Sequence, residues 1–135
     1  MPERAVFALL IILGGVLAWA AVNRLLLRRA AAHAPHDPIL SGILSSRPTV
    51  VYFTTPFCDP CKTQQMPALR QLQAELGETL QVVQIDATEQ PDAADRWGVF
   101  SAPTTFVLDR TQTPRHVNRG VASAERLRQQ IEDVA

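Results

Sequence analysis

The 135-residue chain has few of the residue patterns on which most catalytic and metal sites depend. It contains two cysteines, too few for a disulfide-stapled mini-protein or for a zinc or iron–sulfur site built from cysteines alone. Its three histidines form no catalytic arrangement, and it has no phosphate-binding loop and no internal repeat. These absences exclude several enzyme classes and leave the two cysteines as the candidate chemistry, for which we expect no cofactor.

The charge of the chain is balanced overall but unevenly distributed. Thirteen Lys and Arg residues offset thirteen Asp and Glu residues. Residues 1–29 carry four arginines and one glutamate, a net charge of +3, which leaves residues 30–135 at −3. A mildly acidic domain without a basic patch is poorly suited to bind nucleic acid, so we expect no nucleic-acid partner.

An apolar run without charged side chains extends over residues 5–22. At helical rise this run spans about 27 Å, close to the roughly 30 Å hydrocarbon core of a bilayer. We therefore expect residues 1–29 to form a single-pass transmembrane anchor through residues 5–22, with Trp19 near one interface.

A cleaved signal peptide is the alternative to an anchor, because residues 30–32 are three alanines and offer a small-residue cleavage site. The run is long for a signal peptide, and Arg24, Arg28 and Arg29 lie where positive charge disfavours export. We favour the uncleaved anchor. By the positive-inside rule the same arginines place the C-terminal domain in the cytoplasm, and an outward-facing domain is the alternative.

Residues 30–36 show no periodic pattern, and we expect them to be a linker to a domain over residues 37–135. His33 and His36 are three residues apart beside Asp37, so a weak metal site is the alternative to a solvated linker. Two prolines and the lack of periodicity favour the linker.

The remaining pattern predicts an α/β domain with a four-stranded mixed sheet flanked by helices. Asp37 can cap a short helix that starts at Pro38. The first two strands are joined through a long helix and should be parallel, while the last two are joined by a short turn and should be antiparallel. The expected strands are residues 49–55, 80–86, 104–108 and 115–119, and the expected helices are residues 38–44, the segment from the cysteines to Leu76, residues 91–97 and the segment after Ser123.

The two cysteines, Cys58 and Cys61, form a C-x-x-C motif where the first strand ends and the long helix begins. The first turn of a helix has unpaired N–H groups and a positive dipole end. Both stabilise a thiolate, which is the reactive form of cysteine. This placement indicates thiol–disulfide exchange, and a metal site here would need ligands from elsewhere.

The motif and its surroundings resemble the thioredoxin-like superfamily over residues 37–135. The matching residues are Phe57-Cys58-Asp59-Pro60-Cys61-Lys62 after the first strand and Ala102-Pro103-Thr104 before the third. The resemblance implies a thioredoxin-like fold and a thiol–disulfide oxidoreductase, which the apolar run of residues 5–22 would anchor to the membrane. Its partners would be protein disulfides or dithiols and a thiol protein that donates or accepts electrons.

The resemblance also implies roles for the matching residues. Cys58 would attack a substrate disulfide, and Cys61 would resolve the mixed disulfide. Phe57 and Pro60 would offer substrate-binding surface beside Cys58.

The downstream match implies that Ala102 pairs its backbone with the substrate and that Pro103 is a cis proline facing the cysteines. Asp59 would either raise the pKa of Cys58 through its negative charge or simply cap the helix.

Two positions depart from the family pattern. Thioredoxins have a buried aspartate six residues before the first cysteine and a lysine that partners it, and these positions are Tyr52 and Val82 here. The usual proton acceptor for Cys61 is therefore missing. Its absence leaves two alternatives open: a non-catalytic peptide-binding module that uses the Ala102-Pro103 groove, and a redox sensor.

Overall fold

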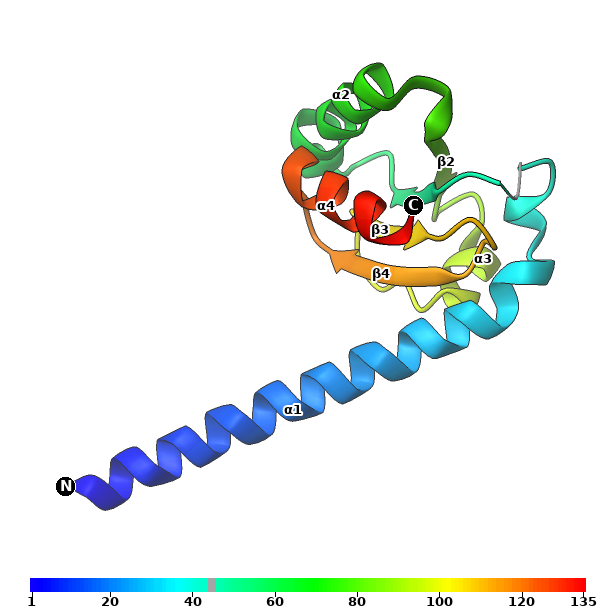
Figure 1. Ribbon diagram of the computed structural model, residues 1–135. Helices are drawn as coiled ribbons and strands as arrows, with labels where there is room; N and C mark the ends of the chain where they lie inside the picture. The colour runs from blue at the N-terminus through cyan, green and yellow to red at the C-terminus, as the bar shows by residue number, and fades with distance from the viewer. Residues whose placement is uncertain (44–45) are drawn as a thin grey trace.

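The computed structural model describes residues 1–43 and 46–135, and it contains a four-stranded sheet with helices on both faces (Figure 1). The strand order is β2-β1-β3-β4, in which β1 pairs in parallel with β2 and the other neighbours are antiparallel. The predicted fold class and strand directions are thus confirmed. The strands are β1 (Thr49–Thr54), β2 (Gln81–Asp86), β3 (Thr104–Leu108) and β4 (Pro114–Arg119).

The central strand β1 is buried along its whole length because both faces of the sheet are covered. Val51 and Phe53 belong to one apolar cluster, which also contains Trp97 from beside α3 (Pro91–Arg96). Val50 and Tyr52 belong to the other cluster, which packs under α2 (Met66–Leu76) and α4 (Ala124–Val134). Alternate residues of β1 therefore point into different cores.

The helix after the cysteines is irregular at its start. Residues Cys61–Gln65 form one turn of π-helix, η3, in which the N–H of Met66 donates to the carbonyl of Cys61. Pro67 follows within the first turn of α2 and has no N–H to donate. The helix therefore changes from π to α type immediately before Pro67.

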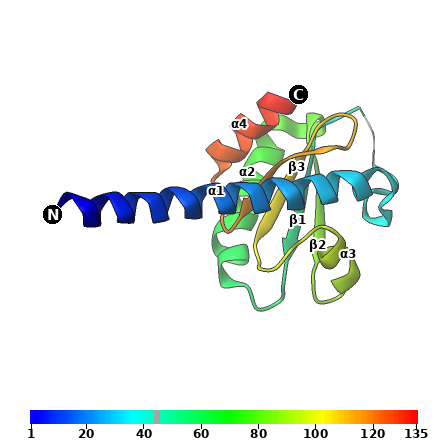
Figure 2. The same cartoon turned by 90° about the horizontal axis from the view of Figure 1, so that it is seen from below.

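The long helix α1 (Pro2–His33) projects from the domain with its N-terminal half free, as both views show (Figures 1 and 2). It is long and apolar enough to cross a membrane, and none of its most apolar stretch is buried. A signal sequence near an N-terminus has the same length and composition.

The C-terminal part of α1 differs from the expected linker over residues 30–36. The helix continues to His33, and the 3-10 turn η1 (Ala34–His36) follows it. Ala30 and Ala34 are fully buried against the cluster that contains Trp97. Alanine favours helix and its small side chain lets α1 approach the sheet closely, so these residues cover the domain instead of linking to it.

Asp37 caps the 3-10 turn η2 (Pro38–Leu40), as predicted, by accepting a hydrogen bond from the N–H of Ile39. The turn ends at Leu40, and Leu44, the expected end of this helix, lies outside the described residues. The same carboxylate accepts hydrogen bonds from Arg96 Nε at 2.9 Å and from Trp97 Nε1 at 2.8 Å. Burial raises the pKa of Asp37, but these hydrogen bonds outweigh it and hold the pKa below its usual value.

Candidate functional site

Cys58 and Cys61 lie just beyond the end of β1 and are joined by a disulfide with 5.2 Å between their Cα atoms. The N–H of Cys61 donates to Cys58 Sγ at 3.2 Å. The sulfur of Cys58 therefore accepts from the first helical turn in the way that a capping side chain does. Cys58 is 8% exposed and Cys61 is 1% exposed, so Cys58 is the more accessible of the two.

Asp59 and Pro60, between the cysteines, are exposed residues of the first helical turn. Since Cys58 Sγ occupies the capping position, the structure does not support a capping role for Asp59. Pro60 has no backbone N–H, and it lies in the first helical turn, where an N–H would have no partner within the helix. No hydrogen bond is therefore lost at this position. Phe57, directly before the motif, is 92% exposed, so its ring adds apolar surface beside Cys58.

Tyr52 lies beneath the motif and is fully buried. Its hydroxyl donates to the carbonyl of Cys61 at 3.3 Å. Burial raises the pKa of Tyr52 above that of an ordinary tyrosine, so this hydroxyl stays protonated near neutral pH. Tyr52 is thus a hydrogen-bond donor at the position where thioredoxins have an acid, and Val82 packs against the same apolar cluster.

The Ala102–Pro103 peptide bond is cis. Ala102 packs against the cluster that contains both cysteines, and Pro103 is buried. The carbonyl of Pro103 accepts a hydrogen bond from the N–H of Gly120 at 2.9 Å. The structure therefore brings Cys58, Cys61 and the Ala102–Pro103 segment together at one end of the sheet.

Gln65 is a residue of this site that the sequence analysis missed. It is fully buried, and its amide both donates to the carbonyl of Ala122 at 3.1 Å and accepts from the N–H of Ala122 at 2.8 Å. This pair of bonds ties the segment after β4 to the helix that carries Cys61. Gln65 lies on the same helical face as Leu69 and Leu72. A polar amide on this apolar face was the sequence feature that could have identified Gln65 as a buried residue with a specific partner.

The histidines lie away from the cysteines. His116, on β4, is within 2.9 Å of Asp133 on α4. Within residues 1–43 and 46–135 no group of three or more His, Cys, Asp or Glu side chains is placed to hold a metal ion.

The sequence of this chain is similar to those of known thioredoxins. The family model described as thioredoxin matches residues 33–133. The chain is 38% identical over 72 residues to thioredoxin from Bacillus subtilis, covering 53% of this chain and 68% of that one. It is 34% identical over 88 residues to chloroplastic thioredoxin Y from Oryza sativa, covering 65% of this chain and 51% of the rice protein, so it spans about half the length of that relative.

Solved structures show the same fold. Mitochondrial thioredoxin 3 from Saccharomyces cerevisiae, in its oxidised form, superposes with a TM-score of 0.58 at 26% identity, covering 67% of this chain and 82% of that one. Chloroplastic thioredoxin z superposes with a TM-score of 0.60 at 22% identity, covering 66% of this chain and 79% of that one. The matched segment contains the Cys58–Cys61 disulfide and supports thiol–disulfide oxidoreductase activity. With its fold, its C-x-x-C disulfide and a family model that spans most of its length, the chain belongs to the thioredoxin family.

Proposed function

We propose that this protein is a membrane-tethered thiol–disulfide oxidoreductase that reduces protein disulfides through Cys58 and Cys61. The observation that carries the proposal is the Cys58–Cys61 pair itself: a disulfide at a helix start, in which the more exposed sulfur accepts a hydrogen bond from a backbone N–H. Such a hydrogen bond stabilises the thiolate that this sulfur becomes on reduction.

The exchange proceeds in two balanced steps. The Cys58 thiolate attacks one sulfur of a substrate disulfide and forms a mixed disulfide with it, while the substrate S–S bond breaks and the other substrate sulfur leaves as a thiolate. The Cys61 thiolate then attacks Cys58 Sγ, which forms the Cys58–Cys61 disulfide and releases the second substrate thiolate. Two electrons pass to the substrate, and a dithiol protein must supply two electrons to reset the pair.

The neighbouring residues have supporting roles in this proposal. Phe57 and Pro60 offer an exposed surface to the substrate chain. Ala102 and Pro103 present the backbone that aligns an extended substrate segment beside Cys58. Asp59 tunes the thiolate by its charge alone, since the capping position is taken.

The tether in this proposal is α1, which crosses the membrane once through residues 5–22. Arg24, Arg28 and Arg29 follow this stretch and favour a cytoplasmic position for the domain. An outward-facing domain is the alternative orientation.

Reduction of a protein disulfide tests the proposed activity. The full chain in detergent or vesicles, supplied with a dithiol reductant, should reduce insulin, while Cys58→Ser should abolish the reaction. Cys61→Ser should instead accumulate a mixed disulfide through Cys58. If the Cys58–Cys61 disulfide forms and is reduced but no protein substrate turns over, the redox-sensor alternative replaces the enzyme. If the pair does not cycle at all, the peptide-binding module does.

A further inference from the structure

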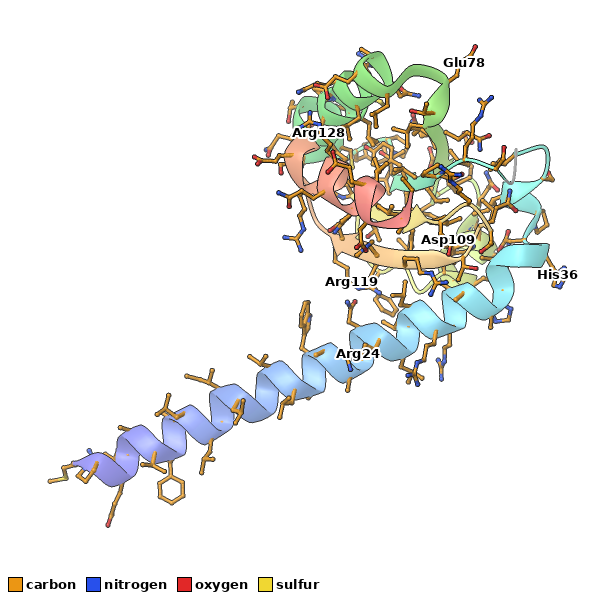
Figure 3. All side chains as sticks on the ribbon, viewed as in Figure 1. Arg24, His36, Glu78, Asp109, Arg119 and Arg128 are labelled. Carbon is orange, nitrogen blue, oxygen red and sulfur yellow. A yellow bond between two sulfur atoms is a disulfide. The ribbon has the colours of Figure 1, made fainter. Side chains whose placement is uncertain are left out.

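The end of the domain that carries the dithiol meets α1 at Arg119, whose partner on α1 is Asn23, directly after the apolar run. Arg119 Nε donates to Asn23 Oδ1 on α1 at 3.2 Å, and Arg119 Nη1 donates to the carbonyl of Gly98 at 2.9 Å. Figure 3 shows this side chain between β4 and α1. Next to it, Leu26 of α1 packs so closely on Gly98 that an added Cβ there would lie 3.2 Å from Leu26 Cδ2.

The contact between α1 and the domain begins before Asn23, inside the apolar run. Trp19 and Asn23 line a hollow of about 130 Å³ whose other walls include Val121 and Arg126 of the domain. Trp19 lies three residues before the end of the apolar stretch at Val22. If residues 5–22 cross the bilayer, the domain therefore rests at the level of the lipid headgroups, with no spacer between them.

The end of the domain that rests there is the end that carries the dithiol. Arg119 is followed by Gly120, which bonds to Pro103, and then by Ala122, which bonds to Gln65 of the cysteine-bearing helix. In both ribbon views the C-terminal end of β4 and the start of α4 lie toward the free N-terminal half of α1 (Figures 1 and 2).

The exposed side chains at this end match a membrane interface. Phe57 is 92% exposed and Phe100 is 77% exposed, and the Phe100 ring lies 5.6 Å from Arg119 Cζ. Val121 is also exposed and lines the same hollow as Trp19 and Arg119. Trp and Arg side chains are enriched where a protein meets lipid headgroups, and exposed Phe rings can bury apolar area there. Charged side chains are present at both ends of the domain: Asp59 and Lys62 are exposed at this end, and the opposite end carries Arg47, Glu78, Arg110, Arg128 and Glu132.

We propose that α1 holds the Cys58–Cys61 end of the domain against the bilayer surface, so that its substrates are disulfides in membrane-proximal segments of integral membrane proteins. The inference rests on the proposed membrane tether and oxidoreductase function and adds to them a fixed orientation. Arg119 is a positioning residue in it, because it joins α1 to the segment that precedes Ala102 and Pro103.

The depth of the catalytic end can be measured without catalysis. Phe100→Cys, Val121→Cys and Glu78→Cys would each carry a maleimide nitroxide, with the native disulfide kept oxidised so that only the added thiol reacts. The full chain is reconstituted in phosphatidylcholine–phosphatidylglycerol vesicles, and collision with oxygen is compared with collision with a water-soluble nickel chelate. Labels at 100 and 121 should favour oxygen several-fold more than the label at 78.

The same measurement separates the possible failures. If the protein is recovered free of the vesicles, the tether and the orientation both fall. If the protein is vesicle-bound and all three labels are equally aqueous, the orientation alone is overturned. Neither result depends on whether the dithiol turns over.

Substrate choice gives the second test. Two single-span peptides carry the same disulfide, one directly after the apolar segment and one after a flexible spacer of about 30 residues, which has a root-mean-square length of about 30 Å. Co-reconstituted wild-type protein should reduce the proximal disulfide about tenfold faster than the distal one, because the fixed orientation raises its effective concentration. Equal rates would overturn the proposal, and absence of any reduction would instead refute the oxidoreductase function.

Arg119→Ala should reduce this proximal-to-distal ratio toward one while leaving reduction of a soluble peptide disulfide in place. Asn23→Ala is the milder variant, because it removes only the bond to α1 and leaves Arg119 bonded to Gly98. Arg115→Ala is the matched control, since Arg115 lies on the same strand but pairs with Asp109. A ratio that stays unchanged in both Arg119→Ala and Asn23→Ala would remove Arg119 from its positioning role.

Discussion

The carboxylate of Asp59 is exposed in the first helical turn, directly after the sulfur that occupies the capping position. Its remaining effect is electrostatic, because a negative charge beside Cys58 disfavours the thiolate. We expect Asp59→Asn to lower the pKa of the Cys58 thiol, with an exposed charge at this range contributing at most about 1 kcal/mol. Titration of the thiolate absorbance in the reduced protein measures the change.

Glu78→Gln is the control for this titration, since it removes an equal charge from an exposed residue at the other end of the domain (Figure 3). The Cys58 titration should not move in this variant. A Cys58 pKa that fails to fall in Asp59→Asn would show that this carboxylate does not tune the thiolate.

The hydroxyl of Tyr52 has a structural consequence rather than an acid–base one. Its raised pKa keeps it protonated, and it donates to the carbonyl of Cys61. Tyr52→Phe should therefore lower the free energy of unfolding by about 1 kcal/mol, the usual contribution of a buried hydrogen bond. The pH profile of insulin reduction should keep its shape. If the acidic or the basic part of the pH dependence disappeared in Tyr52→Phe, Tyr52 would instead be assigned to proton transfer.

At the scale of elements, Asp37 connects the end of α1 and the turn η2 to α3. Its carboxylate bonds to Arg96, Trp97 and the N–H of Ile39. Asp37→Asn replaces the charged acceptor of these hydrogen bonds with a neutral amide. Because hydrogen bonds to a charged group are stronger, we expect the free energy of unfolding at neutral pH to fall by about 2 kcal/mol. Urea unfolding of the full chain in detergent measures it.

The pH dependence of this loss follows from the lowered pKa of Asp37. A carboxyl whose pKa is lower in the folded protein contributes its full stability above the unfolded pKa, about 3.9, and loses it as pH falls through the folded value. The difference between wild type and Asp37→Asn should therefore disappear in acid. Asp95→Asn, on an exposed residue of α3, is the control and should unfold like the wild type at every pH.

The C-terminal part of α1 is a structural element of the domain. Ala30 and Ala34 are buried in the same cluster as Trp97, and Leu27 packs against it. A chain cut to residues 36–135 should lose about 2 kcal/mol, because it exposes the apolar surface that Ala30, Ala34 and the partly buried Leu27 cover. A chain of residues 24–135 keeps these contacts and should unfold at higher urea concentration. Equal midpoints for the two chains would contradict this role for α1.

The elements were predictable from the sequence because each depends on neighbours within one turn or one strand. The continuous run of β-branched and aromatic residues from Val50 to Phe53 and the spacing of Leu69 and Leu72 are local patterns. The contacts that assemble the site are not local: Gln65 reaches Ala122 across 57 residues, and Asp37 reaches Trp97 across 60. Nothing within either segment specifies its distant partner.

The same distinction explains the linker. Residues 30–36 have no amphipathic period of their own, and small alanines carry little hydrophobic signal. Their burial depends on the face of the sheet that Phe53, Trp97 and Phe106 form, and that face exists only after the chain has folded. At the site, the C-x-x-C motif was evident from its spacing, whereas the buried Gln65 on an apolar helical face was not.

At the scale of the whole molecule, the side of the membrane and the redox potential of the dithiol are linked. The arginines after the apolar run favour a cytoplasmic domain. We expect the negative charge of Asp59 to make the Cys58 thiolate less stable, and hence the Cys58–Cys61 disulfide less oxidising. Both arguments predict an equilibrium potential near that of a reducing thioredoxin, about −270 mV.

The potential is measured by equilibrating the full chain in vesicles against a thioredoxin or glutathione redox buffer and quantifying the Cys58–Cys61 disulfide. Protease added from outside to intact cells and to permeabilised cells locates the domain independently. A potential of about −120 to −180 mV would instead mark an oxidase or isomerase, the range of proteins that work in oxidising compartments. If the potential lies in this range and protease digests the domain in intact cells, the domain faces outward. The direction of electron flow is then also the reverse of the proposed one. The positive-inside arrangement would then be overridden, and the pair would accept electrons from substrate dithiols through the same two exchange steps run backwards.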